Sequence, residues 1–395
     1  MELKEKEYWD LEEGKSYFVT RNGSSIIAFH LPKKDFQGFH IVASHSDSPT
    51  YRIKEQPEMS VEKHYTKLNI ERYGGMIPET WFDRPLSVAG RIIIEENGQI
   101  KDQLVNIDRD LMIIPNLAIH MSRSSNESKQ LNPQKDLLPL CGGNLTKDGF
   151  EEMIAKESGV EKEDILSYDL FLYNRMRGTT LGINEEFVAA PKLDDLECAY
   201  SSIEGMLNAK LSKDYVTVCA LFDNEEVGSG TKQGAGSTFF PEVLKRISYL
   251  CEKNEEEYYM AVADSFMLSA DNAHAVHPNY QDKTDPTNRP YINEGIVLKY
   301  NASQKYTTDA NSAALVKYLC KKEKIKCQVF FNRSDMLGGS TLGNILTGQV
   351  SIKAADIGLP QLSMHSTYET AGCKDLDDMI TLMGSFYELG KEVQI

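Results

Sequence analysis

Two adjacent glutamates, Glu225 and Glu226, follow an apolar, β-branched run in the stretch VTVCALFDNEEVGS (216–229). Two like charges side by side are unfavourable unless a positive group compensates them. If Glu226 binds a metal ion, its charge is compensated, and Glu225 remains able to accept a proton from a water molecule on the metal. Zinc lowers the pKa of such a water to about 7, so a carboxylate can take its proton near neutral pH. The pair therefore favours metal-assisted hydrolysis.

Further residues of the chain could complete such a site. His45 and Asp47 are two residues apart at the end of an apolar run, so their side chains project to one side. Asp47 could then hold the second ring nitrogen of a metal-bound His45. The stretch APKLDDLEC (190–198) offers Asp194 and Asp195 ahead of a helical pattern. The stretch SADNAHAVHPN (269–279) offers Asp271, His274 and His277, and LSMHSTYE (362–369) offers His365. Each residue alone is also typical of a turn, a helix N-cap or a core edge. Their convergence at strand ends is what argues for one metal site.

Two other kinds of catalytic site fit the sequence poorly. The glycine-rich stretch GSGTKQGAGS (228–237) matches neither G-x-x-x-x-G-K-[ST] nor G-x-G-x-x-G, and a close-packed loop fits it better. The stretch GGST (338–341) contains a serine, but G-x-S-x-G is absent and Ser340 has no obvious base nearby. We therefore expect neither a nucleotide site nor covalent serine catalysis.

The composition restricts partners and compartment. With 59 acidic and 43 basic residues, the formal net charge is -16, which disfavours nucleic acid as a partner. The charged stretch MELKEKEYWD (1–10) lacks the apolar core of a signal peptide, and no apolar stretch reaches the roughly 20 residues of a membrane span. The 7 cysteines are scattered without a C-x-x-C pair. We expect reduced thiols in a cytoplasmic protein, with His, Asp and Glu as the metal ligands.

The elements that must position these residues follow a repeating pattern. Apolar, β-rich runs end in polar clusters at 38–49, 215–226, 257–268 and 327–336, and helical patterns lie between them at 193–210 and 309–323. Near-continuous apolar strands are buried on both faces, which predicts an α/β fold with a mainly parallel central sheet and helices on both faces. In such sheets, functional residues gather at the carboxyl ends of the strands.

The stretch from about 70 to 186 follows a different pattern. Short strands surround a hairpin signal at Glu96, Asn97 and Gly98, and a helix is predicted near 147–158. Antiparallel strands inside a parallel pattern predict an inserted β-rich domain at 70–186. The catalytic domain would then be discontinuous, formed by 1–69 and 187–395.

Taken together, these motifs resemble the M18 family of metallo-aminopeptidases, the aspartyl aminopeptidase-like enzymes. The matching stretches occur in the family's order over nearly the whole chain: SHSDSP (44–49), ERYGG (71–75), WFDRPL (81–86), IPNLAIHM (114–121), APKLDDL (190–196), LFDNEEVGS (221–229), SADNAHAVHPNY (269–280), GSTLG (339–343) and SMHSTYE (363–369). The resemblance implies a zinc exopeptidase-like fold and the removal of N-terminal residues from peptides.

The resemblance also implies a dinuclear zinc site, in which Co²⁺ or Mn²⁺ could substitute. His45 and Asp271 would hold one ion, Glu226 and His365 the other, and Asp194 would bridge them. Glu225 would be the general base and Asp47 would support His45. This set offers each ion one imidazole and carboxylate oxygens, which suits zinc.

The family further implies a large homo-oligomer, typically a dodecamer, with subunit contacts made by the inserted domain. His120, in NLAIHM (116–121), matches a family histidine that reaches the active site of a neighbouring subunit. From the sequence alone, a histidine at a core edge is the better interpretation of His120, and only the resemblance assigns it a role in the site. Three departures from the family pattern lie near the motifs: Gly338, Tyr368 and the pair Met76 and Pro78 in GGMIPETWF.

The substrate is defined only in part. The family implies peptides with a free N-terminus, and its members prefer either acidic or apolar N-terminal residues such as Leu. We expect acidic residues, with Lys299 or Arg333 as a carboxylate partner, although each could equally form a structural ion pair. A related dinuclear amidohydrolase or deacylase and a noncatalytic cage protein remain as alternatives.

Overall fold

The computed structural model describes residues 1–121, 130–144 and 148–392. Residues 122–129 and 145–147 of the expected insertion, and 393–395, lie outside the described residues. The chain divides into two compact units: residues 1–48, 179–364 and 369–395 form the first, and residues 49–178 and 365–368 form the second. No helix in the described ranges is long and apolar enough to cross a membrane.

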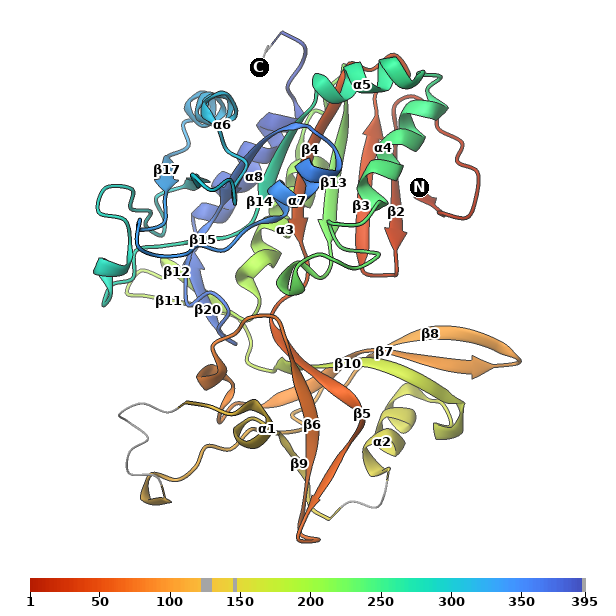
Figure 1. Cartoon of the computed structure of the whole chain (residues 1–395), viewed down its shortest axis with the longest axis vertical. Helices are drawn as coiled ribbons and strands as arrows, with labels where there is room; N and C mark the ends of the chain where they lie inside the picture. The colour runs from red at the N-terminus through yellow and green to blue at the C-terminus, as the bar shows by residue number, and fades with distance from the viewer. Residues whose placement is uncertain (122–129, 145–147, 393–395) are drawn as a thin grey trace. The chain divides into compact units, whose positions relative to one another are not determined.

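A nine-stranded sheet forms the centre of the first unit (Figure 1). Its middle strands β13, β4, β14 and β18 run parallel, whereas β3 and β16 pair antiparallel at either side of them. The predicted α/β fold with a mainly parallel sheet is therefore confirmed. In order across the sheet the strands are β1 (Glu2–Leu3), β2 (Lys15–Arg21), β3 (Ser25–Leu31), β13 (Tyr215–Phe222), β4 (Gly38–His45), β14 (Phe266–Ala270), β18 (Lys353–Gly358), β16 (Ile296–Lys299) and β17 (Cys327–Phe330).

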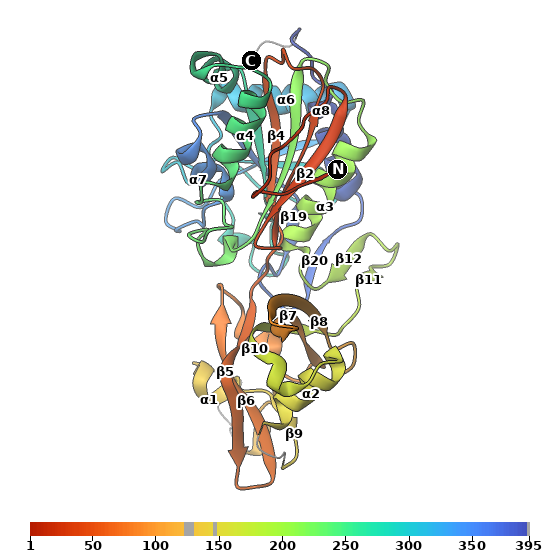
Figure 2. The ribbon, with the colours of Figure 1, turned by 90° about the vertical axis from the view of Figure 1, so that its right-hand side faces the viewer.

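Helices cover both faces of this sheet (Figure 2). The strands are apolar on both sides: in β4, Ile41 packs into the hydrophobic core on one face of the sheet, and Val42 packs into the core on the other face. This alternation follows from the two-residue period of a strand. The helices of the first core are α4 (Phe239–Leu250), α5 (Glu255–Ala263) and α7 (Leu342–Gln349), and those of the opposite face are α3 (Leu193–Asn208), α6 (Ala310–Glu323) and α8 (Asp375–Tyr387).

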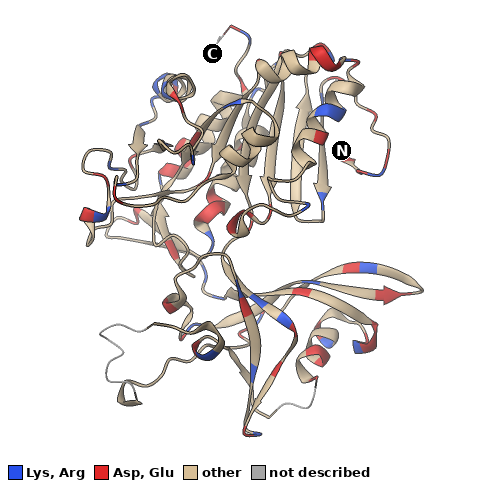
Figure 3. Cartoon of the chain, in the orientation of Figure 1, with Lys and Arg blue, Asp and Glu red and all other residues tan. Residues whose placement is uncertain are grey.

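The helices at 193–208 and 310–323 confirm two predicted helical patterns, but the strand predicted at 257–268 is wrong over its first half. Helix α5 occupies Glu255–Ala263, and strand β14 begins only at Phe266. Asn254 caps this helix in a capping box with Glu257, and acidic residues occupy its first turn (Figure 3). The cap and the helix dipole both favour a helix here, and they override the β-rich composition that suggested a strand.

A smaller five-stranded sheet completes the first unit. It links β11 (Thr179–Leu181), β12 (Phe187–Ala190), β20 (Glu369–Gly372), β19 (Pro360–Leu362) and β15 (Ala273–His274), and short 3-10 helices lie at η4 (Glu225–Val227) and η5 (Gln281–Lys283). Strand β12 leads directly into α3, and β15 follows β14 after two residues. This sheet therefore begins where the strands of the large sheet end.

The second unit is a six-stranded antiparallel sheet with its own apolar core. The Asn97–Gly98 turn joins β7 to β8 with both residues at positive φ, as its hairpin signal predicts. The unit begins at residue 49, because the long strands β5 and β6 pair within this sheet and so lie outside the large one. Its elements are β5 (Thr50–Val61), β6 (Tyr65–Tyr73), η1 (Pro78–Trp81), β7 (Leu86–Glu96), β8 (Gln99–Asn106), η2 (Ile119–Met121), α1 (Pro133–Asp136), β9 (Leu140–Gly142), α2 (Gly149–Ser158), η3 (Lys162–Asp164) and β10 (Ile165–Asn174).

Candidate metal centre

Three neighbouring strands of the large sheet bring the predicted residues together. Strand β4 lies between β13 and β14, and all three run parallel, so their carboxyl ends meet at one edge. His45 is the last residue of β4, Asp271 directly follows β14, and Glu225 begins the short η4 helix after β13. Asp194 enters the same region from the first turn of α3. The topology therefore explains how residues far apart in the sequence reach one site.

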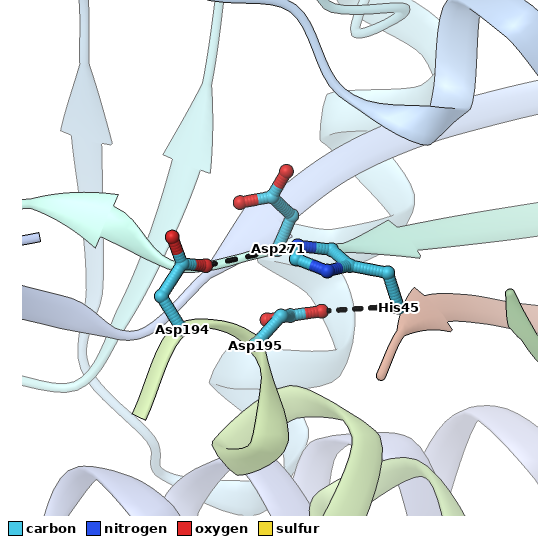
Figure 4. A group of neighbouring side chains, drawn as sticks. All are labelled: His45, Asp194, Asp195 and Asp271. Carbon is cyan, nitrogen blue, oxygen red and sulfur yellow. Dashed lines mark hydrogen bonds and ion pairs between the residues drawn. The ribbon is translucent and has the colours of Figure 1, made fainter. Parts of the chain in front are cut away.

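Four side chains form the buried centre of this site: His45, Asp194, Asp195 and Asp271 (Figure 4). One ligand atom from each lies within 4.8 Å of the others, and His45 Nε2 is 3.8 Å from Asp194 Oδ1. A second group with the same closeness contains His45, Glu225 and Glu226. Buried carboxylates that crowd a histidine are expected where a cation compensates their charge.

Asp195 has a structural role that the sequence did not reveal. Its Oδ2 accepts a hydrogen bond from the backbone N–H of His45 at 3.2 Å, and its Oδ1 accepts one from the N–H of Asn272 at 3.2 Å. One side chain therefore ties the end of β4 to the end of β14. Asp194 and Asp195 are adjacent, so the sequence could identify the pair but could not assign the two roles.

Asp47 contacts both the histidine and the two glutamates. Its Oδ1 lies 3.3 Å from His45 Nδ1, and its backbone oxygen lies 3.1 Å from the same ring nitrogen. Its carboxylate also accepts the backbone N–H groups of Glu225 at 3.1 Å and Glu226 at 3.2 Å. Asn224, in the left-handed region at φ 64, turns the chain toward these contacts. Asp47 thus fixes the His45 ring and the glutamate turn together.

The carboxyl groups here hold protons unusually tightly. Burial, followed by the charge of Asp271, raises the pKa of Glu225 to about 7, and burial together with Asp194 raises the pKa of Glu226 to about 10. Burial lowers the pKa of His45, but Asp195 and Asp47 more than compensate and hold it well above its usual value. These shifts are expected of a site built to exchange protons for a positive ion.

The donor set fits zinc. It provides one imidazole and several carboxylate oxygens, it is buried, and its atoms are close enough to share an ion. No cysteine belongs to the metal-like clusters found among the described residues, so the ligands of this site are nitrogen and oxygen atoms and not thiolates.

Lys299 is a partner of the site itself. Its ammonium is 3.3 Å from Asp271 Oδ1 and donates to the backbone oxygen of Asn272 at 2.9 Å, and the lysine side chain is only 3% exposed. Burial lowers its pKa, but Asp271 and neighbouring groups outweigh this and raise it. The suggestion that Lys299 pairs with a substrate carboxylate is therefore replaced by an ion pair with Asp271.

The remaining predicted residues come from other segments of the chain. His120 is exposed in the η2 helix of the second unit. His365 lies between β19 and β20, and its short segment 365–368 groups with the second unit, where its backbone oxygen accepts the N–H of Ile77. Arg333 pairs with Asp335, at 2.9 and 2.7 Å from its two carboxylate oxygens.

The glycine-rich loop after the glutamates packs against itself. A Cβ atom at Gly234 would lie 2.4 Å from the backbone oxygen of Ser229, and one at Gly236 would lie 2.9 Å from the same atom. Only glycine permits such a close approach. The prediction of a close-packed loop is confirmed.

A cavity of about 340 Å³ opens near the ends of β15 and β19. Asn272, next to Asp271, donates to Gln361 in its wall at 2.9 Å. Of the described residues that line the cavity, none is Asp or Glu, although the chain carries an excess of acidic residues. The basic or titratable lining residues are His274, His277, Lys283 and Arg333, and the large apolar ones are Phe330, Phe331, Met336, Leu337 and Leu362.

The sequence is similar to known proteins over nearly its whole length. Residues 1–387 match the family model described as Aminopeptidase I zinc metalloprotease (M18). A probable M18 family aminopeptidase 2 from Clostridium novyi (strain NT) is 47% identical over 399 residues, covering 98% of this chain and 91% of the relative. A protein of the same description from Pseudomonas aeruginosa (strain UCBPP-PA14) is 38% identical over 393 residues, covering 98% and 90%.

Solved structures share the fold. A chain in the Ape4 and Nbr1 complex is 38% identical, with a TM-score of 0.93 over 98% of this chain and 79% of that chain. The mApe1 dodecamer of S. cerevisiae is 28% identical, with a TM-score of 0.84 over 98% of this chain and 89% of that chain. With this coverage, the similarity includes the three strands and the helix that carry the candidate metal centre.

Proposed function

This chain belongs to the M18 family of metallo-aminopeptidases, and we propose that it removes acidic N-terminal residues from peptides with a dinuclear zinc centre. The observation that carries the proposal is the meeting of His45, Asp194, Asp271, Glu225 and Glu226 at the carboxyl ends of β4, β13 and β14. A site of this kind has the ligands and the base that amide hydrolysis requires.

We assign five residues to the two ions. His45 and Asp271 would hold one, Glu226 and His365 the other, and Asp194 would bridge them. For His365, the support is its position in a short connection between β19 and β20, whose paired strands belong to the first unit. Zinc ions bound here would polarise the scissile carbonyl and lower the pKa of the attacking water. Co²⁺ or Mn²⁺ would substitute, since both accept the same N and O ligands.

Glu225 acts as the general base. Its carboxylate can take a proton from the attacking water and return it to the leaving amine. Asp47 keeps this base in place, because its carboxylate accepts the N–H groups of Glu225 and Glu226. Its contact with His45 Nδ1 orients the imidazole so that Nε2 faces Asp194.

The preference for acidic residues rests on the cavity beside the site. Lys283, Arg333, His274 and His277 line it, and an anionic side chain would meet no Asp or Glu among the described lining residues. Its apolar residues support the alternative, a preference for residues such as Leu. A deacylase remains the rival within hydrolysis, since the same centre would serve a substrate without a free amine.

The working form is proposed to be a cytoplasmic homo-dodecamer. The support is the similar mApe1 chain, whose solved structure is a dodecamer. His120 would act across a subunit boundary, where an exposed imidazole can stabilise the developing negative charge on the substrate oxygen. The inserted β-rich domain would supply the subunit contacts.

Replacing Glu225 by glutamine tests the assignment of the base. Because the amide cannot accept the proton, E225Q is expected to retain its metal and to lose about 10²–10⁴-fold in kcat. Metal content by elemental analysis and hydrolysis of an aspartyl amide are measured on the same sample. Loss of metal in E225Q would mean that the roles of Glu225 and Glu226 are exchanged, and E226Q is the matched variant that should lose metal.

A further inference from the structure

A second carboxylate, Asp356 on β18, is completely buried. It pairs across the sheet with Ser269 on β14, two residues before Asp271. It lies outside every metal-like cluster found in the described residues. A buried carboxylate is costly unless several donors surround it, so the origin of its donors shows what Asp356 holds in place.

The donors come from two separate segments of the chain. Thr307 donates to Asp356 Oδ2 through its backbone N–H at 2.5 Å and through its hydroxyl at 2.6 Å. Thr341 donates its hydroxyl to Asp356 Oδ1. In return, the backbone N–H of Asp356 donates to the Thr308 hydroxyl at 2.9 Å. Asp356 thus joins the segment before α6 to the segment before α7.

The segment before α7 forms part of the cavity wall. Residues 332, 333 and 336–339 all line the cavity, and Thr341 follows the last of them after one residue, Ser340. The Lys305 ammonium donates to the backbone oxygen of Gly338 at 2.6 Å, which fastens the same two segments a second time. A Cβ atom at Gly343 would lie 2.9 Å from both carboxylate oxygens of Asp356, so the beginning of α7 is packed directly against this carboxylate.

The other segment reaches toward the metal centre. Tyr306, next to Thr307, has its ring centre 5.4 Å from the ammonium of Lys299, and that ammonium pairs with Asp271. A continuous set of buried contacts therefore runs from Asp271 through Lys299 and Tyr306 to the residues that Asp356 holds. The position of the cavity wall is fixed relative to a proposed metal ligand.

We propose that Asp356 is a positioning residue for substrate selection: it holds the wall of the cavity that receives the N-terminal side chain of the peptide. This inference rests on the proposed function, because it assigns the cavity to that side chain. Asp356 does not touch the substrate. It acts through Thr307 and Thr341 on the segment that carries Arg333, Met336 and Leu337.

The test compares D356N and T341V with T341S in the metal-loaded full-length protein. Asparagine cannot accept from all the donors, and valine removes one hydroxyl at constant shape, whereas serine retains it. Loss of one hydrogen bond to a charged group can shift the balance between a held and a released cavity wall by about 10–100-fold, and this shift sets the upper limit of its effect on ligand binding. We expect T341V to raise KM for the preferred aminoacyl amide about 10-fold with kcat within about 2-fold of wild type, and T341S to restore KM.

Calorimetric binding of L-aspartate and L-leucine gives a readout that does not depend on turnover. D356N and T341V should weaken the binding of the amino acid that the wild type prefers. For T341V the expected loss of affinity is about 10-fold or more. D375N is the control, because Asp375 is also buried and accepts two backbone N–H groups, from Asn293 and Gly295, away from the cavity. It should leave KM and amino-acid binding unchanged.

The outcomes separate the two proposals. Wild-type protein that hydrolyses no aminoacyl amide contradicts the proposed function. Active wild type with unchanged KM and amino-acid binding in T341V overturns the role of Asp356, and so does a rise in KM that T341S fails to reverse. The T341V variant keeps the Asp356 carboxylate and the other donors to it. T341V therefore still tests the proposal if D356N does not fold.

Discussion

At the level of single residues, the carboxylates of the site have different roles. Asp195 ties two strands together through backbone N–H groups, and Asp47 orients His45 and the glutamate turn. Residue types and spacing predicted that the clusters containing His45, Glu226 and Asp271 converge at strand ends, and the family resemblance selected the ligands among them. They could not predict the bond from Asp195 to Asn272 or the burial of Lys299, because both depend on which strands become neighbours in the sheet.

Protons should leave the protein when zinc binds. In the ion-free protein the pKa of Glu226 is raised to about 10 and that of His45 lies well above its usual value, so both groups are protonated at pH 7. A metal ion binds only the deprotonated forms, so zinc affinity should rise with pH. Zinc titration at pH 7 with an indicator dye should show at least one proton released per chain, and fewer in E226Q. No release between pH 6 and 8 would contradict these protonation states.

The same shifts set the stability of the ion-free protein. A carboxyl group whose pKa is raised in the folded protein makes its full contribution to stability at pH values below its pKa in the unfolded chain. It loses that contribution as the pH rises toward its pKa in the folded protein. For Glu226, the loss of stability extends from about pH 4.5, its ordinary pKa, to about pH 10, its pKa in the folded protein. The melting temperature of chelator-treated protein should therefore fall from pH 5 to pH 8, and zinc should remove most of the fall. A melting temperature of the metal-free protein that does not change between pH 5 and pH 8 would contradict this prediction.

At the scale of elements, the carboxyl ends of β13, β4 and β14 position the site, and α3 brings Asp194 to them. The apolar runs at 38–49 and 215–226 predicted two of these strands. The strand predicted at 257–268 was wrong over its first half, because the prediction rested on β-rich composition and did not include the capping box at Asn254. A local cap decides the structure of a short segment when tyrosines and alanines fit either element.

Helix α3 can carry Asp194 accurately only if it packs closely on α8. A Cβ atom at Gly205 would lie 2.7 Å from Met383 Cβ and 3.2 Å from the backbone nitrogen of Gly384. G205A should therefore lower the free energy of unfolding by about 1–3 kcal/mol, although alanine favours helices. In G348A nothing lies within 4 Å of the new methyl group, so this control should be neutral or slightly stabilising. Chemical denaturation measures both, and equal stability of the two variants would contradict the close packing.

At the scale of the whole molecule, the proposed reaction needs more than one chain. The first unit carries the buried cluster of His45, Asp194, Asp195 and Asp271, whereas His120 belongs to the second unit and is exposed. If His120 acts on a neighbouring subunit, two differently damaged subunits can repair each other. This expectation follows from the family and from the dodecameric mApe1 relative.

Mixed assemblies test the action of His120 across subunits. H120A and E225Q should each be nearly inactive alone, since one lacks the imidazole and the other the base. When the two are co-expressed and assemble together, sites with an intact Glu225 and an intact neighbouring His120 form, and activity should return in part. Light scattering confirms assembly of every sample. A mixture as inactive as its components would place His120 outside the site.

Hydrolysis of aminoacyl amides with a free amine (Asp, Glu, Leu, Met, Ala and Lys) by zinc-loaded protein distinguishes an aminopeptidase from its rivals. Each is paired with its N-acetylated form, and E225Q serves as the control. We expect cleavage of the free-amine substrates, fastest for Asp and Glu, and no cleavage of the acetylated ones. Cleavage of the acetylated amides, or no cleavage of any substrate by metal-loaded and assembled protein, would contradict the assignment of this centre to an aminopeptidase.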